Sequence, residues 1–213
     1  MEATRTRVRD NRVVGPETIA LDLATPDGFD ARPGQFVKLS LDVDGERRSR
    51  FYTLSSPTVD DTFEVTVGVD PDGEVAPYLA ELETGDSVTM AGPFGSAHYE
   101  DESRTTILAG GPGVGPAIGI AERTLDDGGE TAVVYRDDDP VHEDRLDALR
   151  EAGATVHIVG SDVDLTDPTA DALAGDADEQ VFVYGFADFL DAATDALAAA
   201  GGDPDRAKIE NFG

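Results

Sequence analysis

The stretch RFYTLSSP, residues 50–57, combines a guanidinium, two aromatic rings and several hydroxyl groups within eight positions. Side chains alternate across a β-strand, so Arg50 and Tyr52 would share one face. A guanidinium can hold a diphosphate through bidentate hydrogen bonds, and a tyrosine ring can stack on a flat heterocycle. A hydroxyl or backbone N–H of Thr53 could bond a ring nitrogen. These residue types favour a binding site for a flat, phosphorylated cofactor over a plain strand that ends in a turn.

A second candidate site is the glycine-rich segment GGPGVGP, residues 110–116. Gly110 and Gly111 permit a tight turn, and Gly113 lets a backbone approach a pyrophosphate closely. Pro116 suits the first turn of a helix, whose N-terminus offers free N–H groups to an anion. A dinucleotide-binding fingerprint would have glycine at position 116, and a glycine-rich connection without a ligand is the alternative. The position of this segment directly after a buried strand favours the nucleotide site.

The sequence RDDDP, residues 136–140, follows the next predicted strand. An acidic residue at such a strand end can bind ribose hydroxyls, whereas basic residues would favour a 2′-phosphate. Asp137 and its two aspartate neighbours outnumber Arg136, which favours NADH over NADPH. The alternative is a solvated loop, because aspartate is common throughout this chain.

Short strands separated by turns fill the first hundred residues and would position the Arg50 stretch. One short helix is predicted at residues 75–82. Many short strands with turns at this spacing predict a closed β-barrel or a sandwich. The predicted strands are residues 17–25, 34–43, 48–56, 62–69 and 86–92.

Strands and helices alternate after residue 100 and would position the glycine-rich segment. Alternation predicts right-handed crossovers and a doubly wound parallel sheet. A domain boundary is predicted in the polar sequence HYEDES, so that residues 1–100 and 101–213 form two domains with a ligand in the crevice between them. The predicted strands are residues 105–110, 131–136, 155–160, 180–186 and 207–213, and the predicted helices run through residue 125, over 143–153, near 168–173 and over 186–200.

The chain is strongly acidic, with 45 acidic and 16 basic residues in 213 and a net charge of −29. An acidic surface with only two lysines predicts a protein of a high-salt cytoplasm, where salt screens the self-repulsion. An ordinary acidic protein is the alternative. The charge argues against nucleic acid or an anionic membrane as a partner.

The chain contains no cysteine, which excludes disulfides, thiolate catalysis and a cysteine-ligated iron–sulfur cluster. Its three histidines are scattered, so no metal site is expected. No apolar run approaches the roughly 20 residues that span a bilayer, and no secretory signal is visible, which predicts a cytoplasmic protein without membrane insertion.

Several segments, in order, resemble the ferredoxin–NADP(H) reductase superfamily. RFYTLSSP resembles its Arg-x-Tyr-Ser/Thr flavin motif, and GGPGVGP its Gly-Gly-x-Gly-x-x-Pro nucleotide loop, which accounts for Pro116. The segments DGEVAPYL, VFVYGF and KIENFG resemble its Gly-x-x-Ser loop, Cys-Gly-Pro segment and terminal Glu-x-Phe. The resemblance covers nearly the whole chain. It implies an antiparallel Greek-key β-barrel that binds FAD, followed by a doubly wound α/β domain that binds NADH or NADPH.

The resemblance implies Arg50 on the FAD pyrophosphate, Tyr52 against the isoalloxazine and Thr53 near its N5. The chain departs from the family at Ala76, in place of serine, and at Tyr184 and Phe186, in place of cysteine and proline. The implied catalytic residues are Tyr52, Thr53, Tyr184 and Glu210, and the implied cofactor contacts are Arg50, Phe51, Tyr52, Thr53, Ser56, Gly73, Val75, Ala76, Gly110, Gly111, Gly113, Val114, Pro116, Arg136, Asp137, Gly185, Phe186 and Phe212. Phe212 would cover the second face of the flavin or simply pack in the last strand.

The implied activity is hydride transfer from NAD(P)H to flavin, followed by electron transfer to a separate acceptor protein such as a ferredoxin or an oxygenase component. Arg47 and Arg48 would offer an acidic carrier a docking place, or form a solvated hairpin. Two other functions remain open. The chain could be an electron-transfer subunit with a non-catalytic nucleotide site, or a binding module that has lost the flavin.

Overall fold

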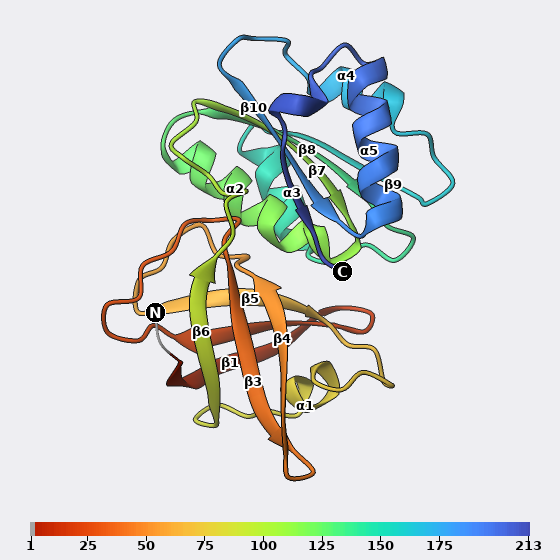
Figure 1. Ribbon diagram of the computed structural model, residues 1–213. Coiled ribbons are helices and arrows are strands. Elements are labelled where there is room, and N and C mark those ends of the chain that lie inside the picture. Colours follow the sequence, from red (N-terminus) through yellow and green to blue (C-terminus); the bar gives the residue numbers. More distant parts are fainter. Residues whose placement is uncertain (1–2) are drawn as a thin grey trace.

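A six-stranded antiparallel sheet forms the lower half of the molecule in Figure 1, a computed structural model that describes residues 3–213. The strand order is β4-β3-β6-β1-β2-β5. A bridge between Leu54 and Val65 joins the two edge strands, so the sheet closes into the predicted Greek-key barrel. The strands are β1 (Thr4–Gly15), β2 (Thr18–Ala24), β3 (Phe36–Val43), β4 (Glu46–Thr53), β5 (Thr62–Gly68) and β6 (Ser87–Phe94).

The barrel interior is filled by the inward-facing residues of its strands. Leu21, Leu39, Val65 and Met90 are fully buried there. The short helix α1 (Ala76–Ala80) covers one end and inserts the buried side chain of Leu79. The predicted helix covers residues 75–82, and the observed helix is shorter because Val75 is its N-cap and Glu81 its C-cap; Pro77 lies in the first turn, where proline is tolerated.

Strand β1 was not predicted from the sequence. It pairs with β2 on one side and β6 on the other, and therefore lies inside the sheet rather than at its edge. Its sequence, TRTRVRDNRVVG, buries only Thr6 and Val8 almost completely. With one small apolar side chain at a buried position, the two-residue hydrophobic period is too weak to see.

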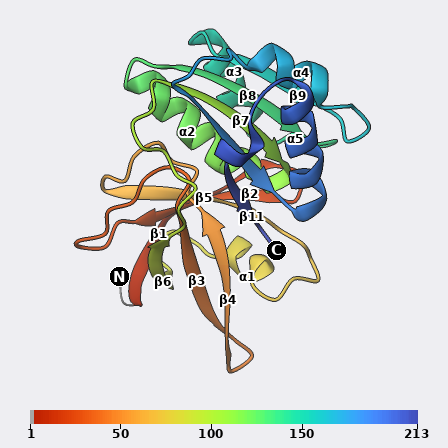
Figure 2. The same cartoon turned by 45° about the horizontal axis from the view of Figure 1, so that its top comes forward.

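A five-stranded parallel sheet forms the upper half of the molecule, in the order β11-β10-β7-β8-β9. Two helices cover each face, so the predicted doubly wound architecture is confirmed (Figure 1 and Figure 2). The strands are β7 (Arg104–Gly110), β8 (Glu130–Arg136), β9 (Thr155–Val159), β10 (Glu179–Gly185) and β11 (Lys208–Asn211), and the helices α2 (Val114–Asp126), α3 (Glu143–Glu151), α4 (Thr166–Ala172) and α5 (Ala187–Ala199).

The parallel strands read as apolar runs because both of their faces are buried. In β7, every residue after Arg104 is buried. Helix α5 turns one face to the sheet, and the predicted face of Phe189, Leu190, Ala193 and Leu197 is buried. The opposite face of α5 is acidic and exposed, as expected for an outer helix of an acidic protein.

The segment between the two sheets, residues 95–103, is tied to both of them. Tyr99 donates its backbone N–H to the carbonyl of Pro33, and the ammonium of Lys208 donates to the carbonyl of His98 at 2.8 Å. Lys208 also pairs with Glu102. These contacts fix the position of the C-terminus, which lies between the two halves in Figure 1.

His142 joins the upper half to the barrel at the start of α3. Its Nε2 lies 2.9 Å from Thr66 Oγ1 on β5, and its backbone N–H donates to the carbonyl of Val14. Burial and, second, the nearby Arg145 guanidinium lower the imidazole pKa to about 4, although the Glu64 carboxylate opposes the shift. The ring is therefore neutral at pH 7.

We expect the stability of the protein to fall as the pH drops from about 6.5 to about 4, because the unfolded chain then binds a proton that the folded imidazole does not. His142→Gln should flatten this slope by at most about 1.4 kcal/mol per pH unit. Urea unfolding across this pH range tests the prediction. His157→Gln, which removes a more exposed ring beside Asp171, is the control. Parallel curves for wild type and His142→Gln would contradict the expected role of this histidine.

Candidate functional site

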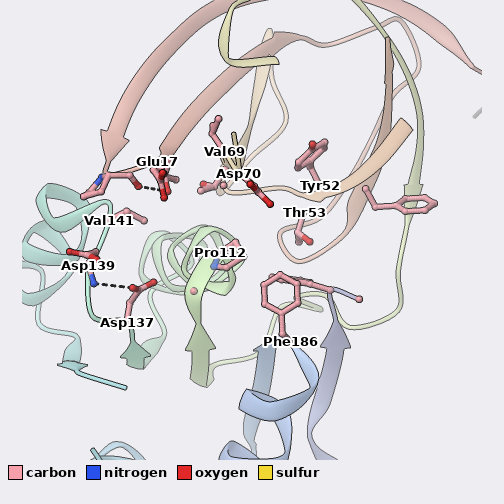
Figure 3. A pocket seen from close by; sticks show the side chains of 18 of the residues that line it. Glu17, Tyr52, Thr53, Val69, Asp70, Pro112, Asp137, Asp139, Val141 and Phe186 are labelled. Carbon is pink, nitrogen blue, oxygen red and sulfur yellow. Dashed lines mark hydrogen bonds between the residues drawn. The ribbon is translucent and has the colours of Figure 1, made fainter. Parts of the chain in front are cut away.

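A cleft of about 830 Å³ lies between the barrel and the parallel sheet (Figure 3). This volume is typical of a small-molecule site. Figure 3 shows Tyr52, Thr53 and Val69 entering from the barrel, and Pro112, Asp137 and Phe186 from the loops of the parallel sheet. The lining residues are Pro16, Glu17, Thr18, Phe36, Phe51, Tyr52, Thr53, Thr66, Gly68, Val69, Asp70, Pro71, Gly111, Pro112, Asp137, Asp139, Val141, Phe186, Glu210, Asn211, Phe212 and Gly213.

The topology of the parallel sheet places the cleft. From β7 the chain crosses to β8 on one side, whereas β10 and β11 lie on the other side of β7. Ligands of doubly wound folds bind outside the carboxyl ends of the strands at such a reversal. The loops that follow β7 and β10 both border the cleft here, through Gly111 and Phe186.

Three adjacent residues at the end of β4 line the cleft, as the sequence predicts for a flavin strand. Phe51 is 60% exposed, whereas Thr53 is almost fully buried. Burial raises the pKa of Tyr52 to about 12, although Arg50 opposes the shift. The Tyr52 phenol therefore stays protonated and offers a neutral ring to the cleft.

Arg50 lies outside the cleft, on the exposed side of β4. Its Nη2 is 2.7 Å from Glu74 Oε2, and Nη1 of Arg48 is 3.1 Å from the other oxygen of the same carboxylate. The predicted diphosphate contacts Gly73, Val75 and Ala76 flank Glu74 in sequence, so they lie beside Arg50. An exposed ion pair of this kind is weak. Two guanidiniums that share one exposed carboxylate fit a diphosphate, which can replace that carboxylate.

The glycine-rich segment forms a turn of 3₁₀ helix at Gly111–Gly113, directly before α2. Gly111 has a positive φ of 54° and open space around it. A Cβ on Gly113 would lie 2.3 Å from the carbonyl oxygen of Tyr184, so this glycine permits close packing on β10. Only Gly111 and Pro112 of the loop line the cleft.

Other predicted contacts of this loop lie behind the cleft rather than in it. Val114 and Pro116 are buried in the first turn of α2. Gly110 is packed so tightly that a Cβ would lie 2.4 Å from Cγ of Phe189. Ser56 is also set back, where its hydroxyl accepts the backbone N–H of Glu64. These residues shape the site through the backbone and do not reach the cleft with their side chains.

Tyr184 does not take the place that the resemblance implies for a residue at the reacting carbon. Its ring is fully buried, and its hydroxyl donates to the carbonyl of Ala97. Burial raises its pKa well above the usual range. The Tyr184 ring points into the core beside the rings of Phe182 and Phe212 and does not line the cleft. In this structure Tyr184 ties β10 to the segment between the two sheets, and its catalytic role stays a prediction.

Phe186 and Phe212 bring two aromatic rings to the cleft from neighbouring strand ends. Their rings are 6.1 Å apart in an edge-to-face arrangement, and Phe186 is 52% exposed. The buried Gly185 supports them, because its carbonyl accepts the backbone N–H of Phe212. Glu210 also lines the cleft, and burial raises its pKa, so its carboxyl holds a proton more readily than a free glutamate.

Two of the three aspartates after β8 face the cleft, whereas Asp138 binds Ser161 and Arg136, at the end of β8, points away. Asp137 and Asp139 line the cleft, and Asp137 accepts hydrogen bonds from the Tyr135 hydroxyl and the Asp139 N–H, each at 3.0 Å. Arg136 instead lies over the ring of Phe189, 5.0 Å from its centre. The side chains available to a ribose here are carboxylates.

Several lining residues were missed in the sequence because no motif marks them. Glu17 and Asp70 come from loops at the barrel rim that are far apart in sequence. Phe36 lies on β3 within a predicted strand, and its ring is 5.4 Å from that of Phe51. The pairing of β3 with β4 could have indicated this contact, since Phe36 is close to the end of the flavin strand in the antiparallel register.

Residues 5–99 match the family described as "Oxidoreductase FAD-binding domain". The chain is 39% identical over 102 residues to the glycine betaine monooxygenase reductase subunit of Chromohalobacter salexigens, which covers 46% of this chain and 28% of that protein. It is 33% identical over 224 residues to the ferredoxin reductase component of 3-ketosteroid-9-alpha-monooxygenase of Mycobacterium tuberculosis, covering 92% of this chain and 62% of that protein.

The fold of the whole chain has solved counterparts. A ferredoxin NADP+ reductase from Neisseria gonorrhoeae, with bound FAD and NADP, aligns over the full length of both chains with a TM-score of 0.82 at 16% identity. The present chain spans less than half the length of the first curated relatives it matches. The flavin-domain match and the sequence relatives make the chain similar to FAD-dependent reductase components, and its fold is that of the ferredoxin NADP+ reductases of the ferredoxin–NADP(H) reductase superfamily.

Proposed function

We propose that this chain is an FAD-dependent NAD(P)H reductase that passes electrons to a separate acceptor protein. The observation that carries the proposal is the cleft, which gathers Tyr52 and Thr53 of the barrel, Gly111 of the nucleotide loop and Phe212 of the C-terminus around one space. A bound flavin would supply the chemistry, accepting a hydride and releasing single electrons.

The residues of the chain would act by binding and orienting. Arg50 would hold the FAD diphosphate, which requires it to leave Glu74. The Tyr52 ring would flank one face of the flavin, while Thr53 would bond its edge. Phe186 and Phe212 would exclude water from the other side of the cleft. The raised pKa of Glu210 suits a group that exchanges a proton beside the flavin.

We further propose NADH as the preferred nucleotide. Asp137 lines the cleft, and its carboxylate can accept hydrogen bonds from ribose hydroxyls but would repel a 2′-phosphate. Arg136, which could offset that repulsion, lies over Phe189 instead. The mechanism needs no strong acid or base to move the hydride, so orientation of the nucleotide is the main task of these residues.

The acceptor is proposed to be a ferredoxin or an oxygenase component. The relatives bear the names of reductase or electron-transfer parts of monooxygenase and dioxygenase systems. This chain has no cysteine for an iron–sulfur cluster of its own. Arg47 and Arg48, on the β3–β4 hairpin next to Arg50, are proposed as the place where the carrier docks, and Arg48 would have to exchange its partners Glu46 and Glu74 for the carrier's carboxylates.

We also propose two domains, residues 1–100 and 101–213, and a cytoplasm of high salt as the working environment. Within residues 3–213, no helix is long and apolar enough to cross a membrane. The net charge of −29 with two lysines supports the high-salt assignment, because concentrated salt would screen the mutual repulsion of the carboxylates.

Anaerobic mixing of the purified flavoprotein with NADH and, separately, with NADPH tests the proposed function. Bleaching of the flavin absorption by NADH, at a lower nucleotide concentration than NADPH requires, is the expected result. Equal or better reduction by NADPH would reject the assignment of Asp137. A bound flavin that neither nucleotide reduces would instead support the non-catalytic subunit, and a colourless protein that binds no added FAD would support the binding module.

A further inference from the structure

Helix α2 lies directly on the backbone that follows the flavin strand. A Cβ on Gly119 would lie 3.1 Å from both the Ser55 carbonyl carbon and the Ser56 oxygen, and a Cβ on Gly115 would lie 2.9 Å from Thr66 Oγ1. The two glycines are four residues apart and therefore share one face of the helix. Because these two positions have no side chain, α2 packs in direct contact with the barrel.

Arg145 of α3 forms hydrogen bonds to both partners of the contact between α2 and the barrel. Its Nε and Nη2 donate to the two oxygens of Glu122 on α2, at 2.8 and 2.6 Å. Its Nη1 donates to Glu64 on β5 at 2.8 Å, and Nη2 also donates to the carbonyl of Ser55 at 2.8 Å. One guanidinium thus joins two helices of the parallel-sheet half to two segments of the barrel.

The ion pair between Arg145 and Glu64 is largely buried, and Glu64 has further hydrogen-bond partners. The Arg145 side chain is 19% exposed and that of Glu64 only 7%. Glu64 also accepts the Ser55 hydroxyl at 2.6 Å and pairs with Arg12 on β1. A buried ion pair contributes little net stability, but an array with all its partners in place favours one arrangement of the packed elements.

Both ends of this array are close to the cleft. Ser55 follows Thr53 by two residues, and Gly115 follows the Gly111–Gly113 turn by two residues. A shift of α2 on the barrel would therefore move the nucleotide loop relative to the flavin strand. Hydride transfer depends steeply on this distance, because a misplacement of about 1 Å can cost on the order of 10²-fold in rate.

We infer that Arg145 is a positioning residue for hydride transfer, which fixes the nucleotide loop against the flavin strand through Ser55, Glu64 and Glu122. The inference rests on the proposed function. It assigns to Arg145 no contact with nucleotide or flavin, since the guanidinium lies behind the cleft and is not among its lining residues. Its effect should therefore fall on the rate of the chemical step rather than on the affinity for either cofactor.

Rapid anaerobic mixing with NADH separates these quantities for Arg145→Met and Arg145→Lys. We expect Arg145→Met to lower the limiting rate of flavin reduction by about 10-fold or more, with an NADH dissociation constant within about twofold of wild type. Arg145→Lys should recover part of the rate, since an ammonium keeps the charge but not the fork. Arg150→Met is the matched control, because it removes an exposed pair with Asp147 on the same helix.

Gly119→Ala provides a second variant that keeps every charge. The added methyl would press on the backbone at Ser55, while alanine improves the helix propensity at this position. We expect a slower limiting rate of flavin reduction without a lower melting temperature. This combination would separate positioning from general stability, and it remains available if Arg145→Met does not fold.

A distance measurement on the same chain supplies a readout that needs no turnover. The absence of native cysteine allows spin labels at Asp27→Cys in the barrel and Asp195→Cys on α5, both exposed. Electron-spin distance distributions should broaden in Arg145→Met and stay narrow in Arg150→Met. Unchanged distributions together with an unchanged limiting rate would overturn the inference. A wild-type flavoprotein that NADH and NADPH both fail to reduce would overturn the proposed function, while the distance measurement would still report on the array.

Discussion

Arg50→Ala should weaken FAD binding by about 10-fold to 100-fold at moderate salt, since a hydrogen bond to a charged group contributes roughly 1.5–3 kcal/mol. Arg50 is more than half exposed, so the lower part of that range applies when salt is high. The loss also leaves Glu74 with Arg48 as its remaining cationic partner beside the diphosphate. Titration of the flavin-free protein with FAD, followed by flavin fluorescence, measures the effect.

Arg47→Ala is the matched control for this experiment. Arg47 precedes Arg50 on the same strand by three positions and therefore faces the other side of β4. Arg47→Ala removes the same charge from the chain as Arg50→Ala, so a general electrostatic effect on FAD affinity would appear in both variants. FAD affinities that fall equally in Arg47→Ala and Arg50→Ala would refute a specific diphosphate contact.

Gly113→Ala should destabilise the folded protein by about 2–3 kcal/mol, the upper part of the usual range for overpacking, and lower its melting temperature by roughly 5–10 °C. The new Cβ would meet the Tyr184 carbonyl oxygen at 2.3 Å, and a backbone atom cannot turn aside as a side chain can. The glycine turn and β10 would have to separate. Thermal unfolding with and without NADH measures both the stability and the nucleotide affinity.

Gly111→Ala separates the steric clash at Gly113 from the cost of a non-glycine residue at a positive φ in the same turn. Gly111 has a φ of 54° but nothing within 4 Å of an added Cβ, so its cost is the left-handed backbone alone, roughly 1–2 kcal/mol. We expect the melting temperature to fall less than in Gly113→Ala. A Gly113→Ala protein as stable as wild type would show that the turn can move away from β10 without cost.

The fold could be predicted because its elements carry strong local patterns. The buried strands of the parallel sheet are apolar runs, and α5 shows its four buried residues at helical spacing. The order of a barrel and then a doubly wound sheet is confirmed, and residues 5–99 match the FAD-binding domain family. Strand β1 was not predicted because its two buried positions are a threonine and a single valine, and its pairing with β2 and β6 holds it in the sheet.

The site was predictable where a motif is local and not where tertiary packing decides. Tyr52, Thr53 and Gly111 reach the cleft, as their motifs predict. Tyr184 does not, because its larger side chain turns into the core, where a hydroxyl finds the Ala97 carbonyl. Arg136 leaves the cleft for the Phe189 ring, a contact between β8 and α5 that no linear pattern encodes.

The glycine face of α2 has a consequence for engineering by recombination. The two halves could be exchanged between relatives, since one half carries the proposed flavin residues and the other the proposed nucleotide loop. Here Gly119 packs on the backbone at Ser55, Gly115 packs on the Thr66 side chain, and Arg145 donates to the carboxylate of Glu64. A chimera that joins the parallel-sheet half to the barrel of a relative would therefore have to keep these barrel residues. Without them, the two halves would pack differently and the two binding sites would be misplaced relative to each other.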